Sequence, residues 1–154
     1  MKQRTGHEGR NLESLILASQ GCGVLLTKIP FSAKRLPGGH IVACCGPCDF
    51  FGIHIASGRM LVFDAKQSKN PHRLPTGAKE FREHQRLELI RYSDAGAISG
   101  LLCESTATGR LYWCSARRFL TRAPSILWED MIDIGPSSHA VEWEKIVVAY
   151  RNNQ

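Results

Sequence analysis

The stretch from Asp49 to Lys66 constrains the fold most, because two apolar runs flank a small Ser57-Gly58 turn. This pattern predicts a β-hairpin. Side chains alternate between the two faces of a strand, so Asp64 and Lys66 share a face. A two-residue loop at Ser57-Gly58 would set Lys66 opposite Asp49. A four-residue loop over residues 55–58 would set Asp64 opposite Asp49, and either register places all three charged side chains on one face.

Two carboxylates on one sheet face repel each other unless a positive charge lies between them. A hard divalent cation such as Mg²⁺, or Mn²⁺ in its place, binds carboxylate oxygens and keeps several waters. A lysine beside that cation can orient a metal-bound water or stabilise a phosphorane. The pattern therefore indicates phosphodiester hydrolysis by Asp49, Asp64 and Lys66. The alternative is a solvated strand face with a weak ion pair, and the apolar run before Asp64 favours the catalytic interpretation.

The same residues resemble a known motif. Asp49, followed after a hairpin by Asp64-Ala65-Lys66, resembles the motif of the PD-(D/E)XK nucleases, the restriction-endonuclease-like superfamily. The chain resembles the RecU-type Holliday junction resolvases more closely. Four segments within about residues 9–105 carry this resemblance: Gly9 to Glu13, Asp49 to Gly52, Phe63 to Lys66 with Lys69-Asn70 and Leu74-Pro75, and Glu83-His84-Gln85.

Two features differ from that family. Asp64 stands where the family more often has Glu, which shortens the side chain by about one methylene. The family also carries a long basic stalk that engages branched DNA, and only Phe31 to Pro47 is available for it here. The second difference concerns junction selectivity more than it concerns cleavage.

The resemblance implies a fold, a site and an assembly. The expected fold is α/β and restriction-endonuclease-like, a mixed central sheet flanked by helices, in a single domain over residues 1–154 with its core at about 9–120. Glu13 is implied as a further metal ligand, although it also suits the first turn of a helix. Gln85 is implied to reach the metal-bound water or a phosphate, although it also fits a half-buried amide with a local partner. Similar resolvases are homodimers that cut both strands of a four-way junction.

Charge and composition agree with a nucleic-acid partner. Twenty basic and fourteen acidic residues give a net charge of +6, which favours polyanions. Apolar runs stay well short of a membrane span, and the polar, basic N-terminus lacks an apolar signal core. We therefore expect a cytoplasmic chain that does not enter a membrane.

Two polar segments carry candidate DNA-binding cations. Lys34 and Arg35 lie in the segment Phe31 to Gly39, which we expect to be a loop that is either solvated or in contact with DNA. Lys69 and Arg73 lie in the loop that leaves the proposed active-site strand, where cations position a duplex through its phosphates. Further positive charge comes from Arg117, Arg118 and Arg122.

Hydrophobic periodicity predicts the remaining elements. Helices are expected from Leu12 to Ala18, with Asn11 as the N-cap, and from Lys79 to Tyr92, with an apolar stripe that includes Leu87. Strands are expected at residues 24–29, 97–103 and 110–115. A helix is expected at residues 125–132, with Trp128 as an anchor. Residues 138–150 stay open, because Trp143, Ile146 and Val147 fit either the domain core or a dimer seam.

A Cys-Gly-Pro-Cys sequence offers a competing interpretation. Cys45 and Cys48 match the thioredoxin-type motif, whose first thiolate sits at a helix N-terminus. Residues 49–55 alternate like a strand instead, and with Cys22 and Cys44 these cysteines make a poor zinc pattern. Cys103 and Cys114 lie in strand-like runs and are expected in the core.

These observations predict a metal-dependent DNA endonuclease that resolves Holliday junctions in recombination and repair. A PD-(D/E)XK nuclease acting on other DNA structures would use every residue named for this site. Two competing hypotheses are a thioredoxin-like oxidoreductase that uses Cys45 and Cys48, and a DNA-binding protein without catalysis.

Overall fold

The computed structural model describes residues 7–30, 32–44, 48–119 and 123–153. Their helices and strands follow one another along the chain as α1 (His7–Ala18), β1 (Val24–Lys28), β2 (Ser32–Arg35), β3 (Ile41–Cys44), β4 (Phe50–His54), β5 (Arg59–Ser68), β6 (Arg73–Pro75), α2 (Glu83–Asp94), β7 (Ile98–Ser105), β8 (Arg110–Ser115), η1 (Ala116–Phe119), β9 (Ser125–Leu127), η2 (Trp128–Asp130), β10 (Ile132–Pro136) and α3 (Trp143–Asn152).

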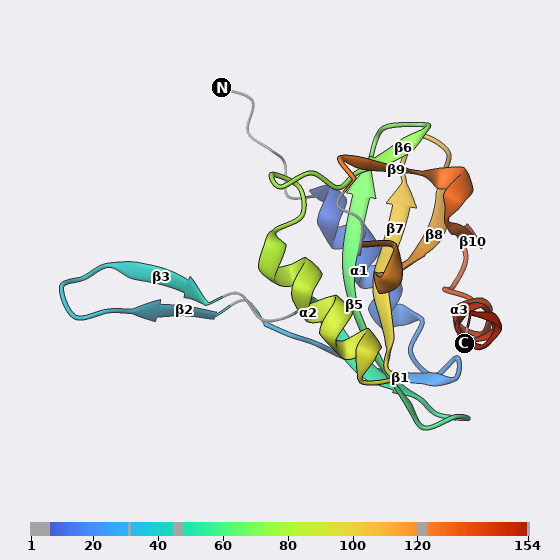
Figure 1. Cartoon of the computed structure of the whole chain (residues 1–154), viewed down its shortest axis with the longest axis horizontal. Coiled ribbons are helices and arrows are strands. Elements are labelled where there is room, and N and C mark those ends of the chain that lie inside the picture. Colours follow the sequence, from blue (N-terminus) through green and yellow to red (C-terminus); the bar gives the residue numbers. More distant parts are fainter. Residues whose placement is uncertain (1–6, 31, 45–47, 120–122, 154) are drawn as a thin grey trace.

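A six-stranded mixed sheet in the order β1-β4-β5-β7-β8-β10 organises the molecule. Only the β5–β7 pair within it is parallel, because α2 carries the chain back across the sheet between those strands. Helices α1 and α2 cover opposite faces of the sheet (Figure 1). The expected mixed, mostly antiparallel sheet flanked by helices is confirmed. In the described part of the chain, no helix has the length and apolar character that crossing a membrane requires.

The β4–β5 hairpin has the four-residue loop, so the two-residue alternative is wrong. His54 pairs with Arg59, and Phe50 pairs with Phe63. Gly58 in the loop has φ +65°, a left-handed conformation that glycine adopts without steric strain. Continued by one residue, this register brings Asp49 opposite Asp64.

Apolar side chains form one cluster on each face of the sheet. Leu12 and Ile16 of α1 pack in the cluster that holds Phe50 and Phe63, whose stacked rings lie 5.2 Å apart. On the other face, Val62 shares a cluster with residues of α2, β6, η1 and η2. Cys103 and Cys114 are buried in this second cluster, so their expected core position is confirmed. Alternation along β5 assigns Asp64 and Lys66 to the same face as Val62.

The segment from Ser125 to Ile132 is not the expected helix. β9 pairs with β6, η2 forms one short turn, and β10 joins the main sheet beside β8. The tertiary structure overrides the helical pattern here, because the buried indole of Trp128 donates a hydrogen bond to the Asn70 carbonyl at 2.8 Å. The sheet therefore extends past residue 120, the expected end of the core.

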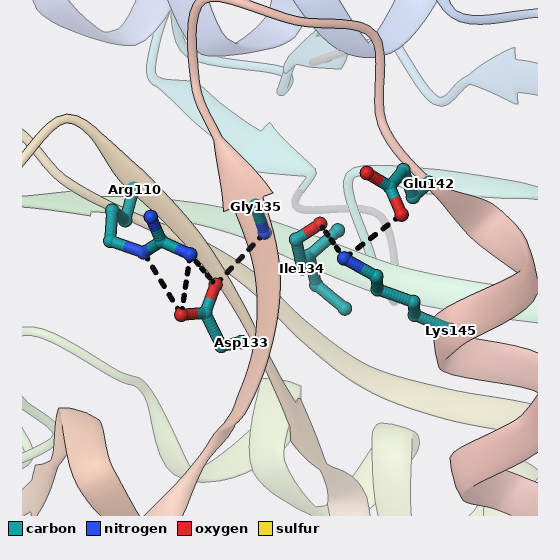
Figure 2. Close-up of polar contacts among 6 residues, drawn as sticks. All are labelled: Arg110, Asp133, Ile134, Gly135, Glu142 and Lys145. Carbon is teal, nitrogen blue, oxygen red and sulfur yellow. Dashed lines mark hydrogen bonds and ion pairs between the residues drawn. The ribbon is translucent and has the colours of Figure 1, made fainter.

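Helix α3 closes the β10 edge of the sheet. Trp143, Ile146 and Val147 are buried in the first cluster, which decides the open question in favour of the domain core. Figure 2 shows how this edge is held: Lys145 donates to the Ile134 carbonyl at 3.3 Å and pairs with Glu142 at 2.9 Å. The neighbouring Arg110 and Asp133 form a bidentate ion pair between β8 and β10 (Figure 2).

Residues 32–39 of the loop expected at Phe31 to Gly39 belong instead to a hairpin over residues 32–44. β2 pairs with β3 from Ser32↔Cys44 to Arg35↔Ile41, and the hairpin projects away from the sheet (Figure 1). Gly38 and Gly39 both have positive φ, which lets the chain reverse tightly while Leu36 donates to the His40 carbonyl at 2.8 Å.

Both predicted helices are shifted at their N-termini. α1 begins at His7, so Asn11 lies inside the helix rather than at its N-cap. α2 begins at Glu83, because residues 77–80 form a turn that contributes Phe81 to the core before the helix starts. Leu87, expected in the apolar stripe, is 51% exposed.

Candidate active site

Asp49 and Asp64 are joined by two reciprocal hydrogen bonds. The Asp49 N–H donates to Oδ1 of Asp64 at 2.8 Å, and the Ala65 N–H donates to Oδ2 of Asp49 at 3.0 Å. Both bonds follow from the hairpin register, which sets the residue before β4 opposite Asp64 of β5. The two carboxylates are therefore held side by side by backbone groups, with little rotational freedom.

Asp64 is fully buried, and its second oxygen is one of three buried side-chain atoms that lack a partner in the described chain, with Gln67 Oε1 and Ser105 Oγ. Oδ2 has no hydrogen-bond partner among the described residues. Burial and, second, the charge of Asp49 raise the pKa of this carboxyl to about 7, while Lys66 and the hydrogen bond from Asp49 oppose the shift. A buried oxygen without a partner is costly in a folded protein and calls for an explanation.

Lys66 lies two residues beyond Asp64 on the same face. Its Nζ is 5.5 Å from the ring centroid of Phe81, in the segment before α2, which is a cation–π contact. The positive charge of Lys66 opposes the rise in the pKa of Asp64. The Phe81 ring thus contacts the ammonium on the sheet face that carries Asp64.

Glu13 has a different partner from the one implied by the resemblance. Its carboxylate forms an ion pair with Lys28 of β1. The neighbouring Leu12 packs on the sheet face opposite to Asp64. In the part of the chain that the structure describes, no three His, Cys, Asp or Glu side chains gather closely enough to hold a metal ion. Glu13 as a third ligand therefore stays a prediction.

Gln85 makes a hydrogen bond to a local partner, which is one of the two roles expected for it from the sequence. Its Oε1 accepts a hydrogen bond from the Arg82 N–H at 3.3 Å, which caps the start of α2. The residue is half-buried. A role toward a metal-bound water stays a prediction.

The carboxylate pair suits a divalent cation. Asp49 and Asp64 provide hard oxygen donors, and the Asp64 oxygen without a partner is the position that a cation would fill. Two carboxylates leave most coordination positions to water, as Mg²⁺ prefers. A cation there would also relieve the repulsion between the two carboxylates.

The candidate DNA-binding cations lie in two separate parts of the molecule. Lys34 and Arg35 belong to β2 of the projecting hairpin, and Arg35 is exposed, whereas the side chain of Lys34 lies outside the described part. Lys69 and Arg73 follow β5, and both are exposed. One pair of candidate cations therefore lies on the projecting hairpin, and the other pair lies close to the end of β5.

Cys48 has the environment of a structural thiol. Its side chain is buried and donates to the Phe50 carbonyl at 3.2 Å. Burial, then the charges of Asp64 and Asp49, raise the pKa of the thiol to about 12. A redox cysteine needs a lowered pKa, and the chain continues into β4 rather than a helix. Cys45 lies outside the described residues, and the geometry of Cys48 disfavours the thioredoxin-like interpretation.

Sequence reasoning missed two arrangements. His54 is 1% exposed, and its ring nitrogens contact Ser57 Oγ and Glu144 Oε1, both at 2.7 Å, which links the β4–β5 turn to α3. Arg117 and Arg118 line a cavity together with Arg73, and their proximity depends on β9 pairing with β6. The sequence signals only the positive charge of the η1 segment.

Comparison with known proteins supports the fold. The sequence matches no protein-family model and no curated protein. The structure is similar to that of Hjc from Archaeoglobus fulgidus, a Holliday junction resolvase from an archaeal hyperthermophile. The TM-score is 0.55 at 14% sequence identity, over 81% of this chain and 94% of Hjc. The likeness confirms the expected fold, an α/β domain with a mixed central sheet flanked by helices. A specific relation to the RecU-type resolvases stays a prediction.

Proposed function

We propose that this chain is a metal-dependent DNA endonuclease that hydrolyses phosphodiester bonds in four-way junctions. One observation carries the proposal: Asp49 and Asp64 are locked together by backbone hydrogen bonds, and Asp64 keeps a buried oxygen without a partner. The fold shared with a Holliday junction resolvase supports the same chemistry. We take the whole chain as one nuclease domain, since β10 and α3 complete the sheet and its core.

Asp49 and Asp64 would hold one or two Mg²⁺ ions. A cation bound there supplies Lewis acidity toward the phosphate and lowers the pKa of a coordinated water. The backbone bonds from Asp49 and Ala65 fix the carboxylates before substrate arrives, so little reorganisation is needed. The burial of Asp64 excludes bulk water from one side of the site.

Lys66 is the residue that acts on the water or the phosphate. Its ammonium is held over the ring of Phe81 and has donors to offer to an attacking water or to a phosphorane oxygen. Attack in line by that water breaks the bond to the 3′ oxygen and leaves a 5′-phosphate. Gln85 and Glu13 are proposed as supporting residues at the edge of the site.

The β2–β3 hairpin provides a structural reason to propose a branched substrate. It projects away from the sheet and carries Lys34 and Arg35, in the place where the resolvases that this sequence resembles carry a basic stalk. A projecting basic hairpin contacts phosphates that a compact domain does not reach. This observation favours junctions over the alternative of a nuclease for other DNA structures.

We propose that the protein acts as a homodimer. Leu25, Phe51, Ile53 and Met60 are between 38% and 58% exposed on neighbouring strands β1, β4 and β5. Leu25 pairs with Ile53, and Ile53 pairs with Met60, so they form one continuous apolar patch on one face. A second copy is the occupant that we propose, because symmetric cutting of two strands needs two active sites.

Cleavage of a synthetic four-way junction tests the proposed function. The junction is compared with linear duplex and flap DNA, with Mg²⁺ or Mn²⁺, for the wild type and Asp64→Asn. Asp133→Asn is the matched control, since Asp133 is a half-exposed carboxylate already paired with Arg110. Paired symmetric nicks in the junction, lost in Asp64→Asn and retained in Asp133→Asn, are the expected result.

Three results would change these conclusions. Cutting of all three DNAs at similar rates would keep the nuclease and reject the junction role. Absence of metal-dependent cutting in any substrate would reject the active-site assignment. For the dimer, light scattering of Ile53→Glu should give a monomer, whereas Val148→Glu on α3, also an exposed apolar position, should leave the dimer intact; a dimer that persists in Ile53→Glu would reject the patch as its interface.

A further inference from the structure

Three arginines line a cavity outside the carboxylate site. The cavity has a volume of about 590 Å³ and lies between the β6–β9 pair and η1. Arg73 comes from β6, and Arg117 and Arg118 come from η1. Among the described residues that line it, Asp130 has the sole carboxylate. The lining therefore carries two more positive charges than negative ones.

Two of the three guanidiniums, those of Arg73 and Arg118, are positioned by neutral groups. Arg118 donates to the backbone carbonyl of Asp130 at 2.6 Å, and Arg73 donates to Ser125 Oγ at 3.4 Å. For Arg117, the contact seen within the described chain is made by its backbone N–H, with Ser115 Oγ, and not by its guanidinium. The three guanidinium charges outnumber the single carboxylate of Asp130, and a bound anion would offset the repulsion between them. The guanidinium fork matches the oxygens of a phosphate group.

The cavity lies on the sheet face that carries the proposed catalytic residues. Leu74 of β6 and Ala116 of η1 are buried in the same cluster as Val62, and Val62 shares its face with Asp64. From β5 the sheet continues through β7 to β8, and the end of β8 leads directly into η1. The cavity and Asp64 therefore lie on the same face of one sheet, with β7 between β5 and β8.

We infer that this cavity binds a backbone phosphate of the DNA substrate, at a distance along the strand from the bond that is cut. The inference rests on the proposed function for the identity of the anion as DNA. The role is one of positioning: Arg73, Arg117 and Arg118 would fix the register of the strand without reading its sequence. Arg117 is the residue to test, because its guanidinium is not committed to either of the hydrogen bonds that hold Arg73 and Arg118.

DNA binding by a catalytically inactive protein tests the inference. Affinity for a labelled four-way junction and a linear duplex is measured without metal in the Asp64→Asn background, from about 50 to 200 mM salt. Adding Arg117→Gln should weaken binding about tenfold, as expected for loss of one charge-assisted hydrogen bond. The slope of log K against log salt should become shallower by about 0.9, the value for one phosphate contact.

Arg91→Gln is the charge-matched control. Arg91 lies on α2 with its side chain 80% exposed, and it is not part of the cavity. Its removal should leave the affinity and the salt slope close to those of the parent protein. An equal loss of DNA affinity in both variants would mean that overall charge explains the effect and would reject the site. An unchanged DNA affinity in Arg117→Gln would reject it as well.

The result separates this inference from the proposed function. If the wild type cuts no DNA but Arg117→Gln still weakens DNA binding selectively, the cavity stands and the nuclease fails. If the wild type cuts junctions and Arg117→Gln binds them normally, the nuclease stands and the cavity fails. A thermal shift with inorganic phosphate that Arg117→Gln abolishes, with DNA affinity unchanged, would assign the cavity to free phosphate and overturn the inference.

Discussion

Replacing Asp64 with asparagine should stabilise the metal-free protein, even though it removes a proposed catalytic group. Asn keeps the shape of the side chain, and its oxygen can still accept the hydrogen bond from the Asp49 N–H. Its neutral amide replaces the buried carboxylate oxygen that has no partner. The substitution therefore removes a buried charge without opening a cavity.

The magnitude follows from the pKa of the carboxyl. The pKa of Asp64 is raised from 3.8 to about 7, so the folded protein binds a proton that the unfolded chain has lost between these values. Stability therefore falls as the pH rises through this window, and the full cost above pH 7 is about 4 kcal/mol. Asp64→Asn should raise the free energy of unfolding by about 4 kcal/mol at pH 8 and by less than about 1 kcal/mol at pH 4.

Urea denaturation in EDTA at several pH values measures this gain. Asp133→Asn, in which the removed carboxylate is half-exposed and paired with Arg110, should show no such pH-dependent gain. Added Mg²⁺ should stabilise the wild type by about 1.4 kcal/mol at ten times its dissociation constant and leave Asp64→Asn unchanged. A variant that is less stable than the wild type at pH 8, or a gain independent of pH, would refute the reasoning.

Three more substitutions test separate parts of the structure. Lys66→Met should keep the fold and DNA binding but lower the cleavage rate at least about 100-fold, measured in single-turnover assays; loss of binding with an unchanged rate would contradict it. Gly100→Ala should destabilise the protein by about 3 kcal/mol in urea unfolding, since its Cβ would lie 2.1 Å from the Cys114 carbonyl oxygen, and near-wild-type stability would contradict that. His54→Leu should lower stability by about 2–3 kcal/mol through two lost hydrogen bonds, whereas Val148→Leu, at an exposed position, should change it little.

The hairpin could be predicted from the sequence because its signals are local. Two apolar runs, a Ser-Gly turn and the alternation of strand side chains suffice to place Asp64 and Lys66 on one face. The same local signals identified β1 and β8, which lie close to their expected bounds. The loop length was open in the sequence, and the pairing of His54 with Arg59 chose the four-residue alternative.

Other features depended on contacts between distant segments. Residues 125–132 have a helical pattern, but pairing of β9 with β6 and burial of Trp128 against Asn70 stabilise strands instead. The β2–β3 hairpin was expected as a loop, because the pairing of Ser32 with Cys44 is not visible in either strand alone. Helix α2 starts at Glu83 rather than at the expected Lys79, because the Phe81 side chain is buried in the core.

The sequence by itself thus determined which groups do the proposed chemistry, namely two carboxylates and an ammonium at hairpin spacing. Only the tertiary structure decided the environment of these groups. Burial raises the pKa of Asp64, and the ring of Phe81 contacts the ammonium of Lys66. The tertiary structure also decided which arginines line one cavity, since Arg73 and Arg117 are distant in the sequence and come together through the β6–β9 pair. Local alternation is encoded within a few residues, whereas burial and charge clustering arise when separate segments pack.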